Sequence, residues 1–322
     1  MKCSAITGFV NIKPMTIANY SKLIFLSLLI GFSFSSFAKQ PEFIIGFPED
    51  NMSNDWRAAQ MNEIKNELKK YPNVRFLMSD AAGSVAKNIF DIEDMVSQGA
   101  QLLFLGPKNP AAITPIAAKL RKKGIRIILL TRKLNTEDYD VFISPDDFRI
   151  AYDAGLYMAN HLKGKGRVLM LEGVRSTSTS IRRKAGFLAS LQNYSGIKVL
   201  KRTANYSRTA AILVIENLLK KGVKFDAIYA HNDAMAAGAR FALKRAGISP
   251  SSIPTIGIDF LPETREAIIQ GEQLASYTYP TCGKVGVAAA IKLLTGKKVP
   301  RYISIPSKLV NINNVKETPT IY

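Results

Sequence analysis

The chain has 322 residues, which gives room for about two domains. Hydrophobic residues make up 47% of it and aromatic residues 9%, so it has the composition of a globular protein, and a disordered or fibrous chain is excluded. The formal net charge is +19, but the basic residues are dispersed over many short segments, so we interpret them as a solvated surface and expect no nucleic-acid binding. Attraction to an anionic envelope surface or to an acidic partner stays open.

The N-terminal segment has the pattern of an export signal. Residues 22–38 read KLIFLSLLIGFSFSSFA, in which one lysine precedes an apolar stretch that is short for a membrane span. The stretch ends in a small-x-small site, so we predict a signal peptide over residues 1–38 that is cleaved after Ala38. An uncleaved anchor helix is the alternative. Cleavage removes three lysines and no acidic residue, which leaves a net charge of +16.

From residue 42 onward, short apolar runs alternate with segments of helical spacing. In the first half we expect strands at 42–47, 73–80, 102–107, 126–132 and 141–146, and helices at 53–71, 85–100 and 110–124. In the second half we expect helices at 147–164, 177–194, 207–222, 234–247, 261–271 and 284–296, and strands at 166–173, 197–205, 225–232, 254–260 and 274–280, followed by an extended segment at 301–314.

This alternation predicts the fold class. Apolar strands that alternate with amphipathic helices form parallel sheets covered on both faces. The pattern starts twice, so we expect an α/β protein with two similar doubly wound parallel-sheet lobes. Ligands of such sheets bind at the carboxyl ends of the strands, and this rule tells us where to look for functional residues.

Polar residues follow most of the predicted strands. They are Asn51, Ser53, Asn54, Asp55 and Arg57 after the first strand, Thr131 and Arg132 after the fourth, Ser176–Ser180 with Arg182 and Arg183 after 166–173, Asn232 and Asp233 after 225–232, and Asp259. Trp56, the sole tryptophan, either packs in the first helix or presents an apolar face for a sugar ring. Carboxylates accept hydrogen bonds from hydroxyl groups while arginine and asparagine donate them, so this mixture suits a neutral polyol.

The segment YAHNDAMAAGA, at 229–239, contains polar residues that can either cap a helix or bind a ligand. Asn232 or Asp233 can cap the helix that follows, or Asn232 can bind a ligand hydroxyl group while Asp233 caps the helix. His231 either orients Asn232 or fills the end of the strand. Because similar polar residues follow several strands, we favour the ligand interpretation for Asn232.

Signatures of an enzyme are absent from the sequence. It contains no GxGxxG segment, no P-loop and no spacing of histidine and cysteine that resembles a zinc site. After signal cleavage Cys282 is the sole cysteine, which we interpret as a small buried residue. We therefore expect a protein that is not an enzyme and that has no cofactor, no metal and no internal disulfide.

Several segments together resemble the periplasmic sugar-binding proteins of ABC importers, of the ribose and galactofuranose type. They are WRAAQMNEIKNE, DMVSQGAQLLFLGP, IRIILLTR, IRRKAGF, YAHNDAMAAGA, GIDFLPETREAIIQGE and ASYTYP. The resemblance implies a type I fold whose lobes, joined by a three-segment hinge, close on a sugar or polyol. It also implies a monomer in the periplasm that delivers this ligand to an ABC permease. We expect one lobe at 39–144 plus 279–303 and the other at 145–278 plus 304–322.

The resemblance also implies binding positions, which are Trp56, Arg57, Arg132, Arg183, Asn232, Asp259 and Thr278. The chain departs from the family at Thr131, where an aspartate is usual before the cleft arginine. This change removes an expected acceptor for two hydroxyl groups. The segment RSTSTSIRR is also more basic than usual, so a negatively charged or modified sugar stays open.

Two other functions are compatible with this fold. A receptor would pass the ligand signal to a membrane sensor, as in chemoreception or autoinducer-2 signalling. A transcription regulator of the lac-repressor type would need an N-terminal helix-turn-helix, but the chain starts with the predicted export signal. A permease and an ATPase encoded nearby would favour transport, and a membrane kinase would favour sensing.

Overall fold

The computed structural model describes residues 43–321, which belong to one compact unit. The predicted signal peptide, like the alternative anchor helix, lies outside the described residues. Between Phe43 and Ile321, none of the helices combines the length and the apolar composition that a membrane span requires.

The first sheet is parallel throughout. Its strands are, in spatial order, β11 (Tyr302–Ser304), β5 (Val141–Ser144), β4 (Arg126–Leu130), β3 (Leu102–Leu105), β1 (Phe43–Glu49) and β2 (Val74–Asp80). The order reverses beside β1, because the chain runs outward from β1 to β2 and then returns to β3 on the other side.

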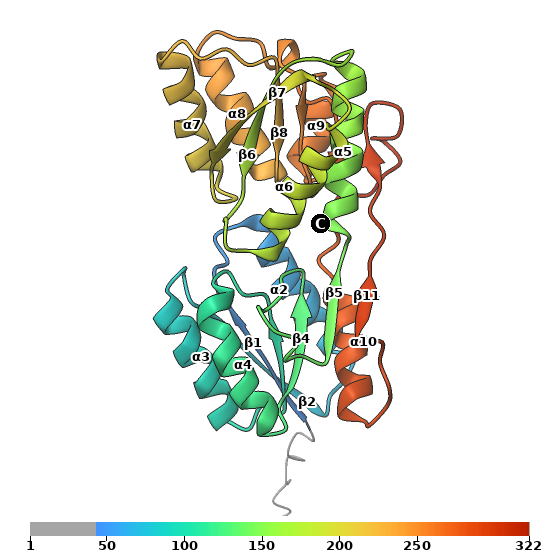
Figure 1. The fold of residues 1–322 in the computed structure, drawn as a ribbon. Coiled ribbons are helices and arrows are strands. Elements are labelled where there is room, and N and C mark those ends of the chain that lie inside the picture. The colour runs from blue at the N-terminus through green and yellow to red at the C-terminus, as the bar shows by residue number, and fades with distance from the viewer. Residues whose placement is uncertain (1–42, 322) are drawn as a thin grey trace, which may run out of the picture. The chain divides into compact units, whose positions relative to one another are not determined.

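The second sheet is also parallel. Its strands are β7 (Gly196–Thr203), β6 (Lys165–Glu172), β8 (Ala227–Ala230) and β9 (Thr255–Ile256). Figure 1 shows each sheet with helices on both of its faces. This arrangement confirms the predicted fold class of two doubly wound lobes, which we call the first lobe and the second lobe.

The helices divide between the two sheets. The first sheet is covered by α2 (Asp55–Leu68), α3 (Val85–Ser97), α4 (Pro110–Lys122) and α10 (Gly283–Leu294). The second is covered by α5 (Asp147–His161), α6 (Ser178–Ser190), α7 (Arg208–Lys220) and α8 (Asp233–Arg245). Beside it lie α9 (Pro262–Ile269) and the short 3₁₀ helix η1 (Pro250–Ser252).

Most of these helices begin at a residue whose side chain caps them. The caps that accept a backbone N–H are Asn54, Ser84, Asn109, Asp146, Thr177, Ser207 and Asn232. Each satisfies one of the N–H groups that the first turn leaves without a partner. Since these caps follow strands, the segments that start helices also face the carboxyl edges of the sheets.

The strands have apolar side chains on both faces. In β3, Leu102 and Phe104 pack against α2 and α10, whereas Leu103 and Leu105 pack against α3 and α4. All four side chains are buried. A strand of period two with both faces covered must be apolar at every position, which explains why continuous apolar runs predicted these strands correctly.

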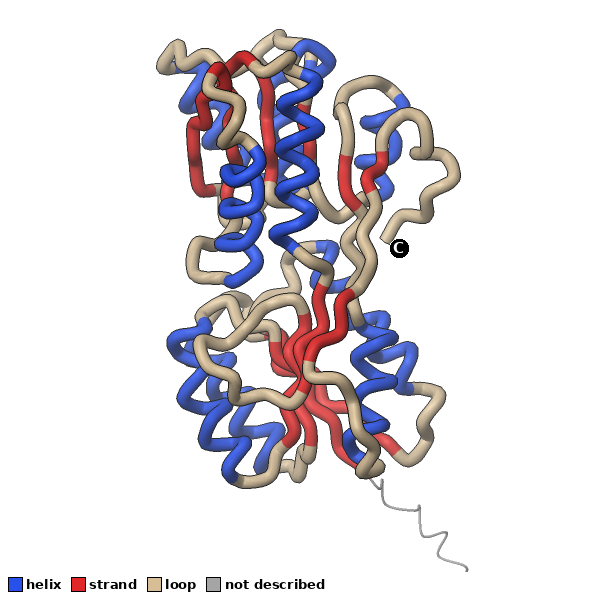
Figure 2. The backbone as a smooth tube through the Cα atoms, turned by 45° about the vertical axis from the view of Figure 1, so that its right-hand side comes forward, coloured by secondary structure: helices blue, strands red, loops and turns tan. Residues whose placement is uncertain are grey.

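Three segments join the lobes (Figure 2). They follow β5, β10 (Ser276–Tyr277) and β11, and the third leads into β12 (Leu309–Val310). β10 and β12 pair antiparallel, which departs from the parallel pattern expected from the sequence. The lobe boundaries expected above, 39–144 with 279–303 and 145–278 with 304–322, stay a prediction.

Candidate functional site

A cavity of 390 Å³ lies between the carboxyl edges of the two sheets. The first lobe contributes residues that follow β1, β3 and β4, among them Asp50, Asn51, Trp56, Arg57, Lys108 and Arg132. The second lobe contributes Thr179, Arg183, Tyr206, Arg208, Asn232 and Asp259, and the hinge segment contributes Tyr279. The rule that placed ligand sites at strand ends therefore led to one shared cavity.

Six of the seven predicted binding residues line this cavity. They are Trp56, Arg57, Arg132, Arg183, Asn232 and Asp259. Thr278 does not line it and borders a neighbouring hollow. There its hydroxyl group accepts the N–H of Lys308 at 2.9 Å, which ties two hinge segments together. Contact between any of these residues and a ligand stays a prediction.

Trp56 both packs in a hydrophobic cluster and borders the cavity, while its contact with a sugar ring stays a prediction. Its side chain is buried. The indole Nε1 donates to the carbonyl oxygen of Tyr279 at 2.8 Å, and the two rings lie 5.6 Å apart. Trp56 and Tyr279 thus join the first helix to a hinge segment and give the cavity an aromatic surface.

An ion pair joins Arg132 and Asp50 on the wall of the first lobe. Nη1 of Arg132 lies 3.0 Å from Oδ2 of Asp50 and donates to the carbonyl oxygen of Gly106 at 3.3 Å. Burial alone would raise the pKa of Asp50, but the guanidinium groups of Arg132 and Arg57 hold it below its ordinary value. Asp50 is therefore ionised at neutral pH.

Thr131 holds the backbone just before Arg132 in an uncommon conformation. Its φ is 61°, in the left-handed region that β-branched residues rarely adopt. Its N–H donates to the carbonyl oxygen of Ile143 at 2.8 Å, and its carbonyl oxygen accepts the hydroxyl group of Thr179 at 2.8 Å. Backbone strain of this kind persists where surrounding contacts maintain it, and it is frequent at functional sites.

Glu49 lies behind the ion pair, at the last position of β1. Its Oε1 accepts the N–H of Asp50 at 3.0 Å, and its Oε2 is buried without a hydrogen-bond partner between residues 43 and 321. Oε2 lies 3.5 Å from Nη1 of Arg57. Burial raises the pKa of Glu49 to about 8 because it outweighs the attraction of Arg57. Glu49 is therefore mostly protonated at neutral pH.

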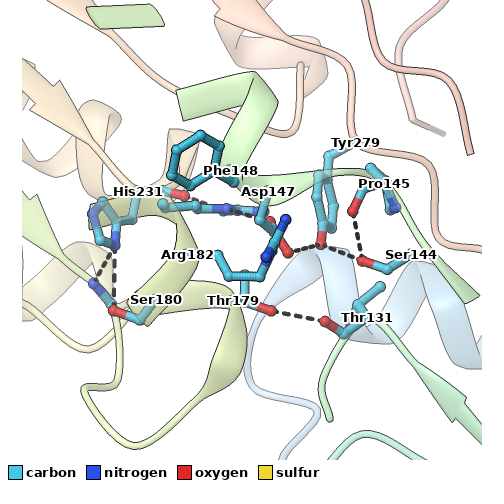
Figure 3. Close-up of polar contacts among 12 residues, drawn as sticks. Thr131, Ser144, Pro145, Asp147, Phe148, Thr179, Ser180, Arg182, His231 and Tyr279 are labelled. Atoms are coloured by element: carbon cyan, nitrogen blue, oxygen red, sulfur yellow. Dashed lines mark hydrogen bonds and ion pairs between the residues drawn. The ribbon is translucent and has the colours of Figure 1, made fainter. Parts of the chain in front are cut away.

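Arg183 is held from three sides on the wall of the second lobe. Its Nε donates to Oδ1 of Asp147 at 2.8 Å, Nη1 donates to the carbonyl oxygen of His231, and Cζ lies 4.4 Å from the ring centroid of Tyr279. Burial alone would lower the pKa of Arg183, but the Asp147 carboxylate raises it well above its ordinary value. Figure 3 shows Tyr279 between Asp147 and Ser144, with its hydroxyl group 3.3 and 3.4 Å from their oxygens.

His231 is a structural residue of the second lobe. It is fully buried, and its Nδ1 accepts the N–H of Gly173 at 3.1 Å and lies 3.3 Å from the hydroxyl group of Ser180 (Figure 3). Burial lowers its pKa well below the ordinary value, so the ring is neutral. Its carbonyl oxygen orients Arg183.

The structure corrects the expected role of Asp233 and leaves the ligand contact of Asn232 a prediction. Asn232 is the N-cap of α8 and accepts the N–H of Met235 at 3.0 Å, while the same side chain borders the cavity. Asp233 does not cap the helix. It is fully buried and accepts hydrogen bonds from the backbone of Phe260 and from the side chains of Gln273 and Ser276. The expectation for Asp233 failed because these donors come from distant segments.

Asp259 borders the cavity on the wall of the second lobe. Its side chain is buried, and no hydrogen bond joins its carboxylate to another described residue. Burial raises its pKa well above the ordinary value. Its φ of 124° is also unusual for a residue with a side chain. A buried carboxyl group without a partner, at the edge of a cavity, is suited to bind a ligand hydroxyl group.

Three hydroxyl groups of the second lobe bind the backbone of the first. Ser176 Oγ donates to the carbonyl oxygen of Lys108 at 2.8 Å, and Ser178 Oγ accepts the N–H of Lys133 at 2.9 Å. The bond from Thr179 to Thr131 completes the set (Figure 3). We call Ser176, Ser178 and Thr179 the hydroxyl latch, because they hold the two edges of the cavity together.

Several cavity residues were missed in the sequence, among them Asp50, Lys108, Tyr206 and Tyr279. Asp50, Lys108 and Tyr206 lie shortly after β1, β3 and β7, so the strand-end rule applied to every strand would have found them. Tyr279 lies in a hinge segment after the very short strand β10, where the pattern gives little signal.

The site combines hydrogen-bond donors, acceptors and apolar surface. Among the described residues, no group of three or more histidine, cysteine, aspartate or glutamate side chains could hold a metal ion. The arginines and Asn232 donate hydrogen bonds, the carboxyl groups accept them, and the aromatic rings provide apolar surface. This combination fits a small hydroxylated molecule.

Comparison with known proteins identifies the family. The family model for the periplasmic binding protein domain matches residues 45–298. The ribose import binding protein RbsB of Bacillus subtilis is 28% identical over 277 residues, covering 85% of this chain and 89% of that protein. The galactofuranose-binding protein YtfQ of Escherichia coli is 27% identical over 266 residues, covering 80% and 83%.

Solved structures agree with this match. The fructose binding periplasmic domain of a hybrid two component system has a TM-score of 0.81 at 30% identity, covering 85% of this chain and 92% of that domain. A galactofuranose binding protein has a TM-score of 0.80 at 26% identity, covering 85% and 96%. The chain therefore belongs to the periplasmic binding proteins, in the sugar-binding group with the type I fold.

Proposed function

We propose that this protein captures a small sugar or polyol in the cavity between its lobes and delivers it to the permease of an ABC importer. The observation that carries the proposal is the cavity itself, where arginine, asparagine and carboxyl side chains from both lobes surround an aromatic surface. The import role is supported by relatives whose names describe ribose import.

We assign ligand contact to Trp56, Arg57, Arg132, Arg183, Asn232 and Asp259, while Thr278 would act on the hinge. The indole of Trp56 would face the C–H surface of the ligand, and the polar groups would bind its hydroxyl groups. Because the polar residues come from both lobes, a ligand would stabilise the closed arrangement by contacts that an open one lacks.

A receptor for a membrane sensor is the second candidate. It is favoured by the similarity to a periplasmic domain that belongs to a hybrid two component system. Deletion of the gene separates the two roles once a ligand is known. Loss of uptake of the labelled ligand supports import, whereas normal uptake with a lost transcriptional response supports sensing.

A thermal-shift screen of pentoses, hexoses in both ring forms, inositols and sugar acids tests the binding function. A ligand at one hundred times its Kd stabilises the folded protein by about 2.7 kcal/mol, and at one thousand times by about 4.1 kcal/mol. If no compound in these classes raises the melting temperature, the proposed function is wrong.

Arg132→Ala should abolish the shift given by the best ligand of that screen. Arg132 borders the cavity and is nearly buried, so its loss removes donors that the ligand needs. Circular dichroism should show that the variant is folded. A full thermal shift in the folded variant would place Arg132 outside the binding site.

A further inference from the structure

The carboxylate beside Arg132 comes from an unexpected place in the sequence. Position 131, directly before this arginine, is a threonine and offers no carboxylate. Asp50 supplies a carboxylate instead. It follows β1, which is separated from β4 by β3 in the first sheet, and its Oδ2 approaches Nη1 of Arg132 to 3.0 Å. The side chains of Arg132 and Asp50 are only 10% and 11% exposed, so water screens their attraction weakly.

This ion pair leaves hydrogen-bonding capacity for a ligand. A carboxylate has about four acceptor positions and a guanidinium group has five N–H donors. The structure shows one ion-pair contact between them, one bond from Arg132 to Gly106, and a side-chain hydrogen bond between Glu49 and Asp50. Asp50 and Arg132 can therefore accept from one hydroxyl group and donate to the next, which matches two adjacent hydroxyl groups of a polyol.

The same pair is unfavourable for an anion. A ligand carboxylate placed on Arg132 would lie next to the charge of Asp50, and like charges brought together in this way repel each other. Arg183 on the opposite wall already has Asp147 at 2.8 Å. Arg132 and Arg183 are thus neutralised by the protein. Two other cavity cations have no ionised ion-pair partner among residues 43–321: Lys108, which forms no ion pair, and Arg57, whose partner Glu49 is mostly protonated. They are the competing sites for an anionic group.

We propose that Asp50 sets the charge selectivity of the cavity, so that the site accepts an uncharged polyol with adjacent hydroxyl groups and rejects the matching sugar acid. This inference rests on the proposed function and extends it, because it names the class of ligand and the residue that selects it. Asp50 acts directly, as an acceptor for the ligand, and through Arg132, whose charge it balances.

Isothermal titration calorimetry with matched pairs tests the proposal. The pairs are D-ribose with D-ribonate, D-galactose with D-galacturonate, and myo-inositol with D-glucuronate. We expect the protein to bind a neutral member at least one hundred times more tightly than its acid. Asp50→Asn has the same shape without the charge. In this variant the Kd of the neutral ligand should rise at least tenfold, and the ratio of the Kd of the acid to the Kd of the neutral ligand should fall at least tenfold.

Two further variants make the result specific. Asp50→Glu keeps the charge and should still reject the acids, which tests the charge even if Asp50→Asn folds poorly. Asp80→Asn is the matched control, since Asp80 ends the neighbouring strand β2, does not line the cavity, and caps nearby N–H groups through Oδ1, which asparagine retains. Its preference should equal that of the unmodified protein.

The outcomes separate this inference from the proposed function. If the unmodified protein prefers an acid, or if folded Asp50→Asn keeps the original preference, Asp50 does not set selectivity, although a sugar-binding function stands. Loss of acid binding in Lys108→Met would then identify Lys108 as the anion site. If neither class of compound binds, the proposed function fails, and the role of Asp50 fails with it.

Discussion

Glu49 has a buried carboxyl group whose pKa, about 8, lies well above its ordinary value of 4.5. The folded protein therefore holds this proton in a pH range where the unfolded chain has released it. The contribution of Glu49 to the free energy of unfolding therefore falls as pH rises through that range, by up to about 1.4 kcal/mol per pH unit. Glu49→Gln cannot titrate, so its stability relative to the unmodified protein should rise between pH 5 and pH 8 and stay constant above.

Urea unfolding of both proteins at pH 5, 6.5, 8 and 9 measures this difference. The comparison cancels the other titrating groups, because they are common to both chains. Parallel stability curves over the whole range would mean that Glu49 is ionised in the folded state and that Arg57, 3.5 Å away, compensates its burial.

Single residues were predictable where one local rule decides their place. Arg132, Arg183 and Asp259 follow buried strands, and the parallel arrangement brings such positions to one edge. Asp50 follows the same rule, but the polar residues predicted after the first strand began at Asn51. The bonds of Asp233 to distant residues could not be predicted, since they depend on how segments far apart in sequence fold together.

Helices α5 and α6 approach each other closely, and both carry residues of the site. A Cβ atom added at Gly186 would lie 2.2 Å from the carbonyl oxygen of Phe148, a backbone atom that cannot easily move. Gly186→Ala should therefore destabilise the protein by about 1–3 kcal/mol, as overpacked cores do. Because α5 carries Asp147 and α6 carries Arg183, the change should also weaken ligand binding.

Thermal unfolding and calorimetry measure these two effects. Gly222→Ala is a useful comparison, since a Cβ atom at Gly222 would contact nothing within 4 Å. Its effect on stability comes only from the positive φ of 67°, and its effect on binding should be absent. Equal losses of binding in the two variants would contradict a role for the contact between α5 and α6.

Elements were predictable to the extent that their periodicity was clear. Long helices and fully buried strands appear where the sequence placed them, because four consecutive apolar residues such as those of β3 must be covered on both faces. The antiparallel pair of β10 and β12 was not expected. Each has two residues, which is too short for a pattern, and their pairing depends on the path of the hinge.

The arrangement of the two lobes is held partly by the hydroxyl latch. Its three hydrogen bonds join side chains of the second lobe to backbone groups of the first, and each contributes about 0.5–1.5 kcal/mol. Combining Ser176→Ala, Ser178→Ala and Thr179→Val should shift the equilibrium toward open lobes. We expect the apparent Kd of the ligand to rise at least tenfold, because ligand binding must then supply the free energy of closure.

Calorimetry gives the Kd, and small-angle X-ray scattering without ligand shows whether the lobes separate further. Ser252→Ala is the control, because the hydroxyl group of Ser252 bonds within the second lobe at 2.7 Å to Ser249. A Kd within twofold of the original in the triple variant would show that the latch contributes nothing to closure.

The sole tryptophan places an intrinsic fluorophore at the wall of the cavity. Trp56 borders the cavity and its indole N–H is bonded to the segment that links the lobes. The indole emission of the chain therefore originates at one place, on the wall of the proposed binding cavity. Under the proposed function, a change in this emission on adding a ligand would report occupancy and the rate of binding without a dye.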